Sequence, residues 1–180
     1  MLYMFFANGF EEVEAIAALD VIRRAKIEIK SVGINDKIIT GSHGISIVCD
    51  MMAADISDFG NVDGIILPGG MPGTTNLFEN DTVHEVIDFC SANNKLLCAI
   101  CAAPLILGRK DLLAGKKAVC FPGFEDELKG ASVSDEFVCT DGNVITAKGM
   151  GSAVNFGIEI VAYFKGREFA DTLKSTLQCS

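Results

Sequence analysis

Short apolar runs alternate along the chain with segments whose apolar residues recur every three or four positions. Apolar runs without alternation predict strands that are covered on both faces, and four of them are residues 2–7, 27–33, 62–67 and 96–100. Helices are predicted between and after them, over residues 12–26, 81–93, 153–164 and 167–177. Strands that alternate with helices indicate parallel βαβ units, and therefore a doubly wound three-layer sandwich.

Smaller elements complete this pattern. Residues 38–40 and 45–48 predict a hairpin, residues 117–120 a strand, and residues 137–139 and 144–147 two strands joined by a turn. In the helix predicted over 12–26, the apolar residues expected to pack on the sheet are Val13, Ile16, Ala17, Leu19 and Ile22.

The segment from Asn94 to Gly108 predicts the central chemical feature of the chain. A buried strand over residues 96–100 leads to Cys101, and the small residues Ala102 and Ala103 then allow a tight reversal. Pro104 suits a first helical turn, where its missing N–H would be unpaired anyway. This arrangement is typical of a nucleophile elbow, with a thiol in place of the usual hydroxyl.

A thiol on such a bend faces free N–H groups and the positive end of the helix dipole, so the thiolate is expected to be favoured. A pKa near ~5.5 in place of ~8.5 would ionise it almost fully at neutral pH. Cys101 is therefore predicted to be reactive, whereas Cys98, inside the strand, is predicted to be an inert buried thiol.

Two further segments are expected to meet Cys101 at the carboxyl ends of the strands, where sites form in such sheets. Residues 69–73 are rich in glycine, so their backbone N–H groups can approach a ligand closely. Residues 8–14 bring Glu14, about one turn into a helix and close to its apolar stripe; by itself this position fits either a surface carboxylate or a residue of the site. Glu11 and Glu12 are explained more simply, as carboxylates that suit a helix N-terminus.

Composition limits the classes of function. The 180 residues are 49% apolar with a net charge of −9, which predicts one globular domain over residues 1–180 and argues against nucleic acid or an anionic membrane as a partner. No apolar run approaches the ~20 residues of a membrane span, and residues 2–7 are too short for a signal peptide.

Seven cysteines without a secretion signal predict free thiols in a reducing compartment, and hence a cytoplasmic protein. A thioredoxin-type role for the Cys98-x-x-Cys101 pair is disfavoured, because such a pair begins a helix. With His43 and His84 as the only histidines, a zinc site is also disfavoured, and no cofactor is expected.

Four motifs together resemble the DJ-1/ThiJ/PfpI family in order and spacing, and they cover essentially the whole chain. They are residues 9–14 (GFEEVE), 67–70 (LPGG), 99–104 (AICAAP) and 146–151 (TAKGMG). The resemblance implies a flavodoxin-like three-layer α/β/α sandwich with a mostly parallel sheet and a nucleophile elbow, like that of class I glutamine amidotransferases. It also implies a homodimer.

The resemblance further implies that Cys101 is the nucleophile and that Glu14 is a buried, protonated carboxylic acid against its sulfur. Backbone N–H groups of Gly70 and Ala102 would form an oxyanion pocket. Burial next to a thiolate raises the pKa of a carboxyl group, which fits this role of Glu14.

Three functions remain open on these residues. The first is a cofactor-independent glyoxalase or protein deglycase acting on small aldehydes and dicarbonyls. The second is a redox-sensing, stress-protective protein or chaperone, in which Cys101 is oxidised to the sulfinate. A cysteine peptidase or amidotransferase is less favoured, because Ala102 stands where peptidase-like members have His.

Other departures from the family pattern limit what it implies. Phe121 precedes Pro122 where some relatives place a His, and Ala103 replaces a Gly found in some members. His43 falls near the dimer contact expected from the family, and we do not assign it as a base.

Overall fold

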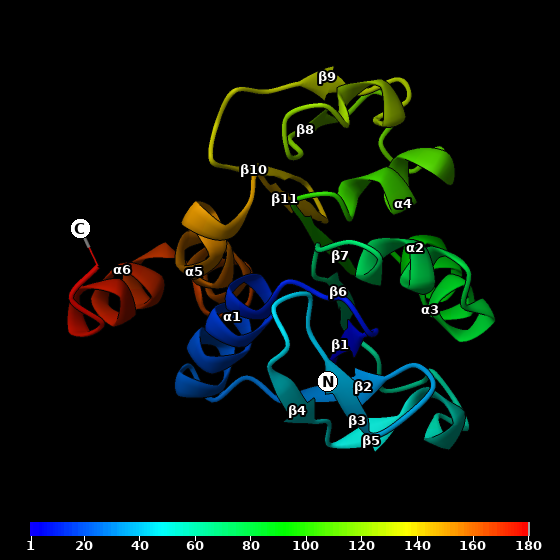
Figure 1. The fold of residues 1–180 in the computed structure, drawn as a ribbon. Helices are drawn as coiled ribbons and strands as arrows, with labels where there is room; N and C mark the ends of the chain where they lie inside the picture. The colour runs from blue at the N-terminus through cyan, green and yellow to red at the C-terminus, as the bar shows by residue number, and fades with distance from the viewer. Residues whose placement is uncertain (180) are drawn as a thin grey trace.

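The computed structural model describes residues 1–179, and a seven-stranded sheet in the order β10-β11-β7-β6-β1-β2-β5 forms its centre (Figure 1). All neighbouring strands are parallel except β10 and β11, which form an antiparallel pair. The strands are β1 Leu2–Phe6, β2 Ile29–Gly33, β5 Met51–Met52, β6 Gly64–Leu67, β7 Leu96–Ile100, β10 Val138–Asp141 and β11 Val144–Ala147.

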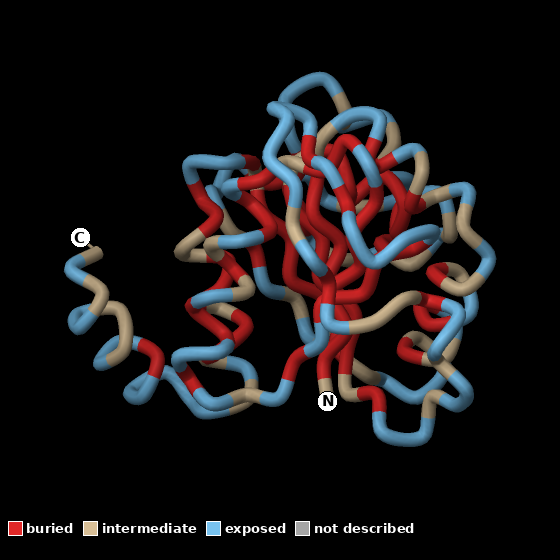
Figure 2. The backbone as a smooth tube through the Cα atoms, turned by 60° about the horizontal axis from the view of Figure 1, so that its bottom comes forward, coloured by how far each residue is buried: buried red, intermediate tan, exposed pale blue. Residues whose placement is uncertain are grey.

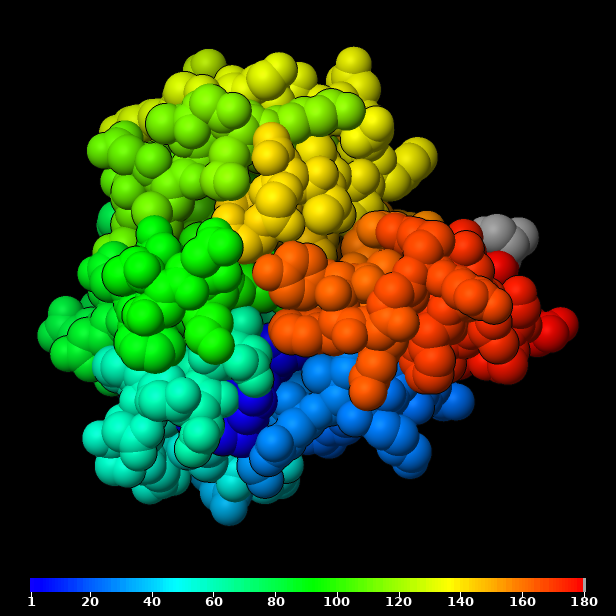
Figure 3. Space-filling model, turned by 180° about the vertical axis from the view of Figure 1, so that it is seen from behind, coloured from blue at the N-terminus to red at the C-terminus, as the bar shows by residue number. Residues whose placement is uncertain are grey.

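Helices cover both faces of this sheet. On one side lie α1 (Glu12–Arg24) and α5 (Ala153–Lys165), with α6 (Arg167–Thr176) packed outside α5. On the other side lie α2 (Gly73–Phe78), α3 (Asp81–Ala92) and α4 (Pro104–Arg109). From behind, the orange and red surface of α5 and α6 borders the blue N-terminal part of the chain (Figure 3). The predicted α/β three-layer sandwich is confirmed.

The central strands are buried along their whole length (Figure 2). In β1, Phe5 joins the apolar cluster under α3 and α4, whereas Phe6 joins the cluster under α1 and α5. Because successive side chains of a strand point to opposite faces, a sheet covered on both sides needs apolar residues at every position. This is the physical reason for the unbroken apolar runs in the sequence.

The apolar stripe predicted for α1 is wrong in part. Ile22 is buried as expected, but Val13 and Ile16 are 48% and 40% exposed. The buried residues of α1 are instead Glu12, Glu14, Ala15, Ala18, Val21 and Ile22. A Cβ on Gly157 of α5 would lie only 3.2 Å from the Cα of Ala18. Close approach of the two helices at Ala18 and Gly157 thus requires small residues there, while Val13 and Ile16 lie on the outer face of α1.

Smaller differences occur at the periphery. The hairpin is present as β3 (Ile38–Thr40) and β4 (Ser46–Val48). The strand predicted over 117–120 is shorter, and it leaves the main sheet to pair β8 (Lys117–Ala118) with β9 (Ser132–Val133). Short elements that the periodicity did not predict are β5, α2 and β9 and the 3-10 turns Ala53–Asp55, Glu125–Glu127 and Met150–Ser152.

Within residues 1–179, every helix is too short or too polar to span a lipid bilayer.

Candidate active site

Cys101 occupies a tight bend between β7 and α4. Its φ of +65° is in the left-handed region, which residues other than glycine rarely adopt. The bend is anchored on both sides, because the Cys101 N–H donates to Ala147 O at 2.9 Å and the Phe121 N–H donates to Cys101 O at 2.8 Å. The strand, the bend and the short helix therefore form the predicted nucleophile elbow, with strain of the kind found at functional sites.

Glu14 meets this thiol from the first turn of α1. Its side chain is buried, accepts a hydrogen bond from the Gly69 N–H at 3.0 Å and lies next to the Cys101 side chain. The Glu11 carboxylate caps the helix by accepting from the Glu14 N–H at 2.7 Å, which fixes the backbone at this position. The structure thus brings together two residues that lie 87 positions apart in the chain.

Two backbone N–H groups complete the site. Those of Gly70 and Ala102 lie beside the Cys101 sulfur and act to lower the pKa of its thiol, which is where donors for an oxyanion would be needed. Gly70 has a φ of +90°, and a Cβ there would lie 2.4 Å from the Glu11 backbone nitrogen. Only glycine can therefore present its N–H to Cys101 at this point.

The electrostatics of the site couple the ionisation of Cys101 to that of Glu14. Burial, together with the nearby Glu14 carboxylate, raises the pKa of the Cys101 thiol to about 12, and the N–H groups of Ala102 and Gly70 oppose this only in part. Burial also raises the pKa of Glu14 from its ordinary 4.5 to about 7. These effects act on the thiol while Glu14 is ionised, so the predicted reactivity of Cys101 depends on which of the two groups carries the proton.

The two groups instead compete for a proton. When Glu14 carries it, the carboxylate charge that opposes ionisation of Cys101 is gone, and the carboxylic acid can donate to the sulfur. Proton transfer from the thiol to Glu14 therefore places the negative charge on the sulfur, where the Gly70 and Ala102 N–H groups face it. A carboxyl group with a pKa near 7 suits such proton transfer at neutral pH.

Comparison with known proteins is consistent with this geometry. The model of the DJ-1/PfpI family matches residues 1–163. The chain belongs to the DJ-1/PfpI family.

Relatives within this family differ in length. Protein DJ-1 homolog A of Arabidopsis thaliana is 34% identical over 95% of this chain but only 44% of its own length, so the chain spans less than half of that plant protein. Glutathione-independent glyoxalase DJR-1.2 of Caenorhabditis elegans is 30% identical over 93% of this chain and 89% of its own. The structure of oxidized Toxoplasma gondii DJ-1 superposes with a TM-score of 0.94 at 28% identity, covering 99% and 98% of the two chains.

The histidines lie apart from the Cys101–Glu14 pair of this family member. His43 Nδ1 lies 3.0 Å from the carboxylate of Glu12, and His84 contacts Phe78 O and Lys110. Glu12, expected from the sequence as a carboxylate that suits the helix N-terminus, is 4% exposed and also accepts from the His43 N–H at 2.7 Å. Hydrogen bonds to the loop of the β3–β4 hairpin hold the pKa of Glu12 near 2 despite its burial.

Cys98 is fully buried inside β7, and burial raises its pKa well above the usual thiol range. Its strand position supports the structural role that the sequence suggests. All seven cysteines are free thiols.

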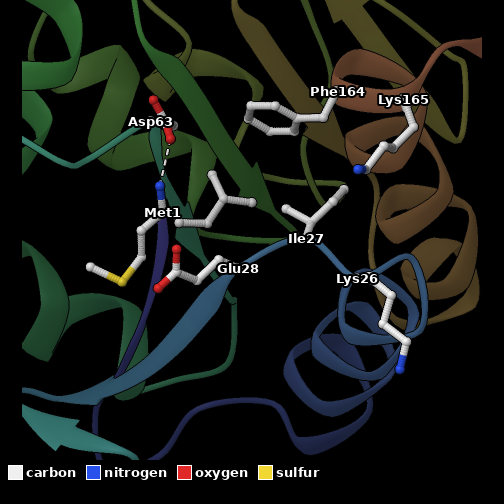
Figure 4. Close-up of a pocket in the computed structure, with 8 residues that line it drawn as sticks. Met1, Lys26, Ile27, Glu28, Asp63, Phe164 and Lys165 are labelled. Carbon is white, nitrogen blue, oxygen red and sulfur yellow. Dashed lines mark hydrogen bonds and ion pairs between the residues drawn. The ribbon is translucent and has the colours of Figure 1, made fainter.

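A hollow of about 290 Å³ lies at the opposite end of the sheet (Figure 4). It is formed around the amino end of β1, where the Met1 ammonium pairs with Asp63, and Ile27 and Lys165 also line it. None of its lining residues is a thiol, and the carboxyl end of β7 that carries Cys101 is remote from it. The Cys101–Glu14 pair is therefore the candidate active site.

Replacing Gly69 even by alanine is predicted to destabilise the fold. A Cβ there would lie 2.6 Å from both Cys101 Cβ and Glu14 Oε2, so the pair must move apart. We expect Gly69→Ala to lower the free energy of unfolding by about 1–3 kcal/mol, as overpacking does, in urea titrations at neutral pH. Gly151→Ala is the matched control, because nothing lies within 4 Å of a Cβ there; equal stability of the two variants would contradict this geometry.

Glu14 is also predicted to make stability depend on pH. Its folded-state pKa lies above its ordinary value, so its contribution is fully present below pH 4.5 and is lost as the pH rises through about 7. Glu14→Gln removes this dependence. Between about pH 5.5 and pH 8.5, we expect unfolding free energies to shift by about 2 kcal/mol in favour of the Gln variant. Parallel pH curves for the two proteins would show that Glu14 is not desolvated.

Proposed function

We propose that this chain is a cofactor-independent cysteine enzyme of glyoxalase or deglycase type, which acts on small reactive carbonyls such as methylglyoxal and glyoxal. The observation that carries the proposal is a buried carboxyl group next to a thiol on a strained bend, with the N–H groups of Gly70 and Ala102 beside the sulfur. The printed name of the C. elegans relative, a glutathione-independent glyoxalase, supports the same reaction class.

The first step is addition of the Cys101 sulfur to the aldehyde carbon of the substrate. The S–C bond forms while the thiol proton passes to Glu14, and the carbonyl electron pair becomes an alkoxide facing the N–H groups of Gly70 and Ala102. Protonation of this alkoxide gives a hemithioacetal.

The second step moves a proton within the hemithioacetal of a 2-oxoaldehyde. Glu14, as carboxylate, removes the hydrogen from the carbon bonded to sulfur, and the neighbouring carbonyl carbon gains a proton. The hydroxyl proton of the hemithioacetal passes to the neighbouring oxygen, so the first carbon becomes the thioester carbonyl and the second carries the hydroxyl group. The product is the thioester of a 2-hydroxy acid, and water then cleaves it and restores the thiol. One water is consumed overall, and no external oxidant or reductant is needed, so the Cys101–Glu14 pair suffices for the chemistry.

The test is production of lactate from methylglyoxal by the purified protein, with neither glutathione nor any cofactor added. We expect one lactate for each methylglyoxal consumed. Consumption without lactate would indicate simple alkylation of the protein and would contradict the proposal.

A redox-responsive, stress-protective or chaperone role is the second candidate, because the groups around the Cys101 sulfur could also hold the oxygens of a sulfinate. The similar structure of T. gondii DJ-1 is of the oxidized protein, which supports this second candidate. Graded peroxide followed by peptide mass spectrometry tests it. Cys101 should gain two oxygens before Cys179, which is also partly exposed; earlier oxidation of Cys179 would contradict this role.

We also propose that the chain forms a homodimer and is cytoplasmic. Exposed apolar side chains of α1 and of the β3–β4 hairpin, including Val13, Ile16 and Ile45, line one outer surface and support an interface there. Sedimentation velocity of the wild type and of Ile16→Asp would test the dimer. Seven free thiols fit a reducing compartment.

A further inference from the structure

An apolar groove of about 380 Å³ opens next to the candidate active site, and neither the catalytic pair nor the proposed dimer surface accounts for it. Three large apolar side chains on it are exposed to solvent: Phe121 by 47%, Phe137 by 67% and Met150 by 56%. Its other main lining residues are Pro122, Lys148 and Gly149.

The groove is continuous with the reacting groups. The Phe121 backbone N–H donates to the carbonyl oxygen of Cys101 at 2.8 Å, so the groove begins at the elbow itself. Gly149 lies between the groove and Glu14, because a Cβ there would be 3.2 Å from the Phe121 ring and 3.9 Å from Glu14 Oε1. A side chain at Gly149 would therefore contact both the Phe121 ring and the Glu14 carboxyl group, and glycine keeps this space open between the groove and the site.

A groove of this kind has a chemical preference. Exposed aromatic rings gain free energy when an apolar or aromatic group covers them, and ring pairs add a further ~0.5–1.5 kcal/mol. A methyl group, as in methylglyoxal, covers little of such a surface. A ring or branched chain attached to the reacting carbonyls would cover more of it while its aldehyde carbon lies at Cys101.

We propose that this groove binds the substituent of the substrate, so that the favoured substrates are 2-oxoaldehydes carrying an aromatic or branched apolar group. This inference rests on the proposed function and names its substrate class. Phe121 is the main specificity-determining residue, since it contacts both the elbow and the groove, and Phe137 forms the outer part of the same surface. Binding energy gained there holds the reacting carbonyl at the Cys101–Glu14 pair.

The experiment compares kcat/KM for phenylglyoxal and methylglyoxal in the wild type, Phe121→Ala and Phe137→Ala. We expect the phenylglyoxal-to-methylglyoxal ratio to fall about 10-fold in Phe121→Ala and by a smaller factor in Phe137→Ala. The wild-type ratio serves as the reference and removes the difference in intrinsic reactivity between the two aldehydes. Phe169→Ala is the matched control, because Phe169 is 45% exposed on α6, outside the groove, and should leave the ratio unchanged.

The outcomes separate this inference from the proposed function. Turnover of both aldehydes with the same ratio in the wild type and both groove variants would overturn the groove assignment and leave the proposed function intact. Failure of the wild type to convert either aldehyde would overturn the proposed function, and this inference with it. An equal fall in the ratio in Phe169→Ala would show a global effect and would also overturn the assignment.

Discussion

Cys101→Ser is expected to lower lactate production from methylglyoxal by about 10³-fold or more. Loss of a covalent nucleophile leaves only the contributions of binding and oxyanion stabilisation. A serine hydroxyl is far less acidic than a thiol, so a carboxyl group with a pKa near 7 is too weak a base for it. Steady-state assays with lactate as the measured product give the size of the effect.

Cys179→Ser is the control for Cys101→Ser, because Cys179 is also a partly exposed free thiol but lies near the end of the chain, beyond α6. We expect it to retain wild-type activity. Comparable losses in the two variants would indicate that nonspecific thiol chemistry consumes methylglyoxal, and would contradict an active-site role for Cys101.

Glu14→Gln is expected to lower the same activity by about 10²- to 10⁴-fold, the usual range for loss of a general acid–base group. The amide keeps the approximate shape of the carboxyl group and can still accept from the Gly69 N–H, but it cannot take the thiol proton. Wild-type kcat/KM should therefore rise with pH through about 7, as Glu14 becomes a carboxylate. This inflection should be absent from the residual activity of the variant.

Glu28→Gln is the control for Glu14→Gln, since Glu28 is an exposed carboxylate that lines the hollow at the opposite end of the sheet. It should leave both the rate and the pH profile unchanged. A wild-type profile that is flat around pH 7, or an inflection that persists in Glu14→Gln, would show that another group moves the proton.

The sequence predicted the elbow well because its signals are local. An apolar run ends at Cys101, two alanines follow, and Pro104 begins α4, so each residue by itself favours the geometry observed. The meeting of Glu14, Gly70 and Cys101 was also predictable, since parallel strands bring their carboxyl ends to one edge of the sheet.

Features that depend on tertiary contacts were not predictable in the same way. Periodicity identified α1 but not which of its apolar residues face the sheet and α5, and Ile16 faces outward. The sequence places Glu12 in the first turn of a helix. Its burial and its contacts with His43 depend on the hairpin loop, which is distant in the sequence. The sequence shows Phe121 at the position where some relatives have a His. That Phe137 and Met150 line the same groove as Phe121 becomes apparent only in the folded structure.

The pKa of Cys101 illustrates the same limit. Local sequence predicts a helix N-terminus beside the thiol, which lowers a pKa. The larger effects are burial and the charge of Glu14, which raise it, and both depend on how α1 packs against β7 and the Gly69–Gly70 loop. Reactivity in this site therefore belongs to the pair of residues and not to the cysteine alone.

The most direct test of the central claim, that Cys101 and Glu14 act as one catalytic unit, is a double-mutant cycle on the initial rate of lactate formation. The four proteins are the wild type, Cys101→Ser, Glu14→Gln and the double variant. If the pair acts as a unit, the double variant is no slower than Cys101→Ser, because Glu14 has no thiol proton left to accept. Losses that multiply in the double variant would mean that the two residues act independently, and would contradict the account.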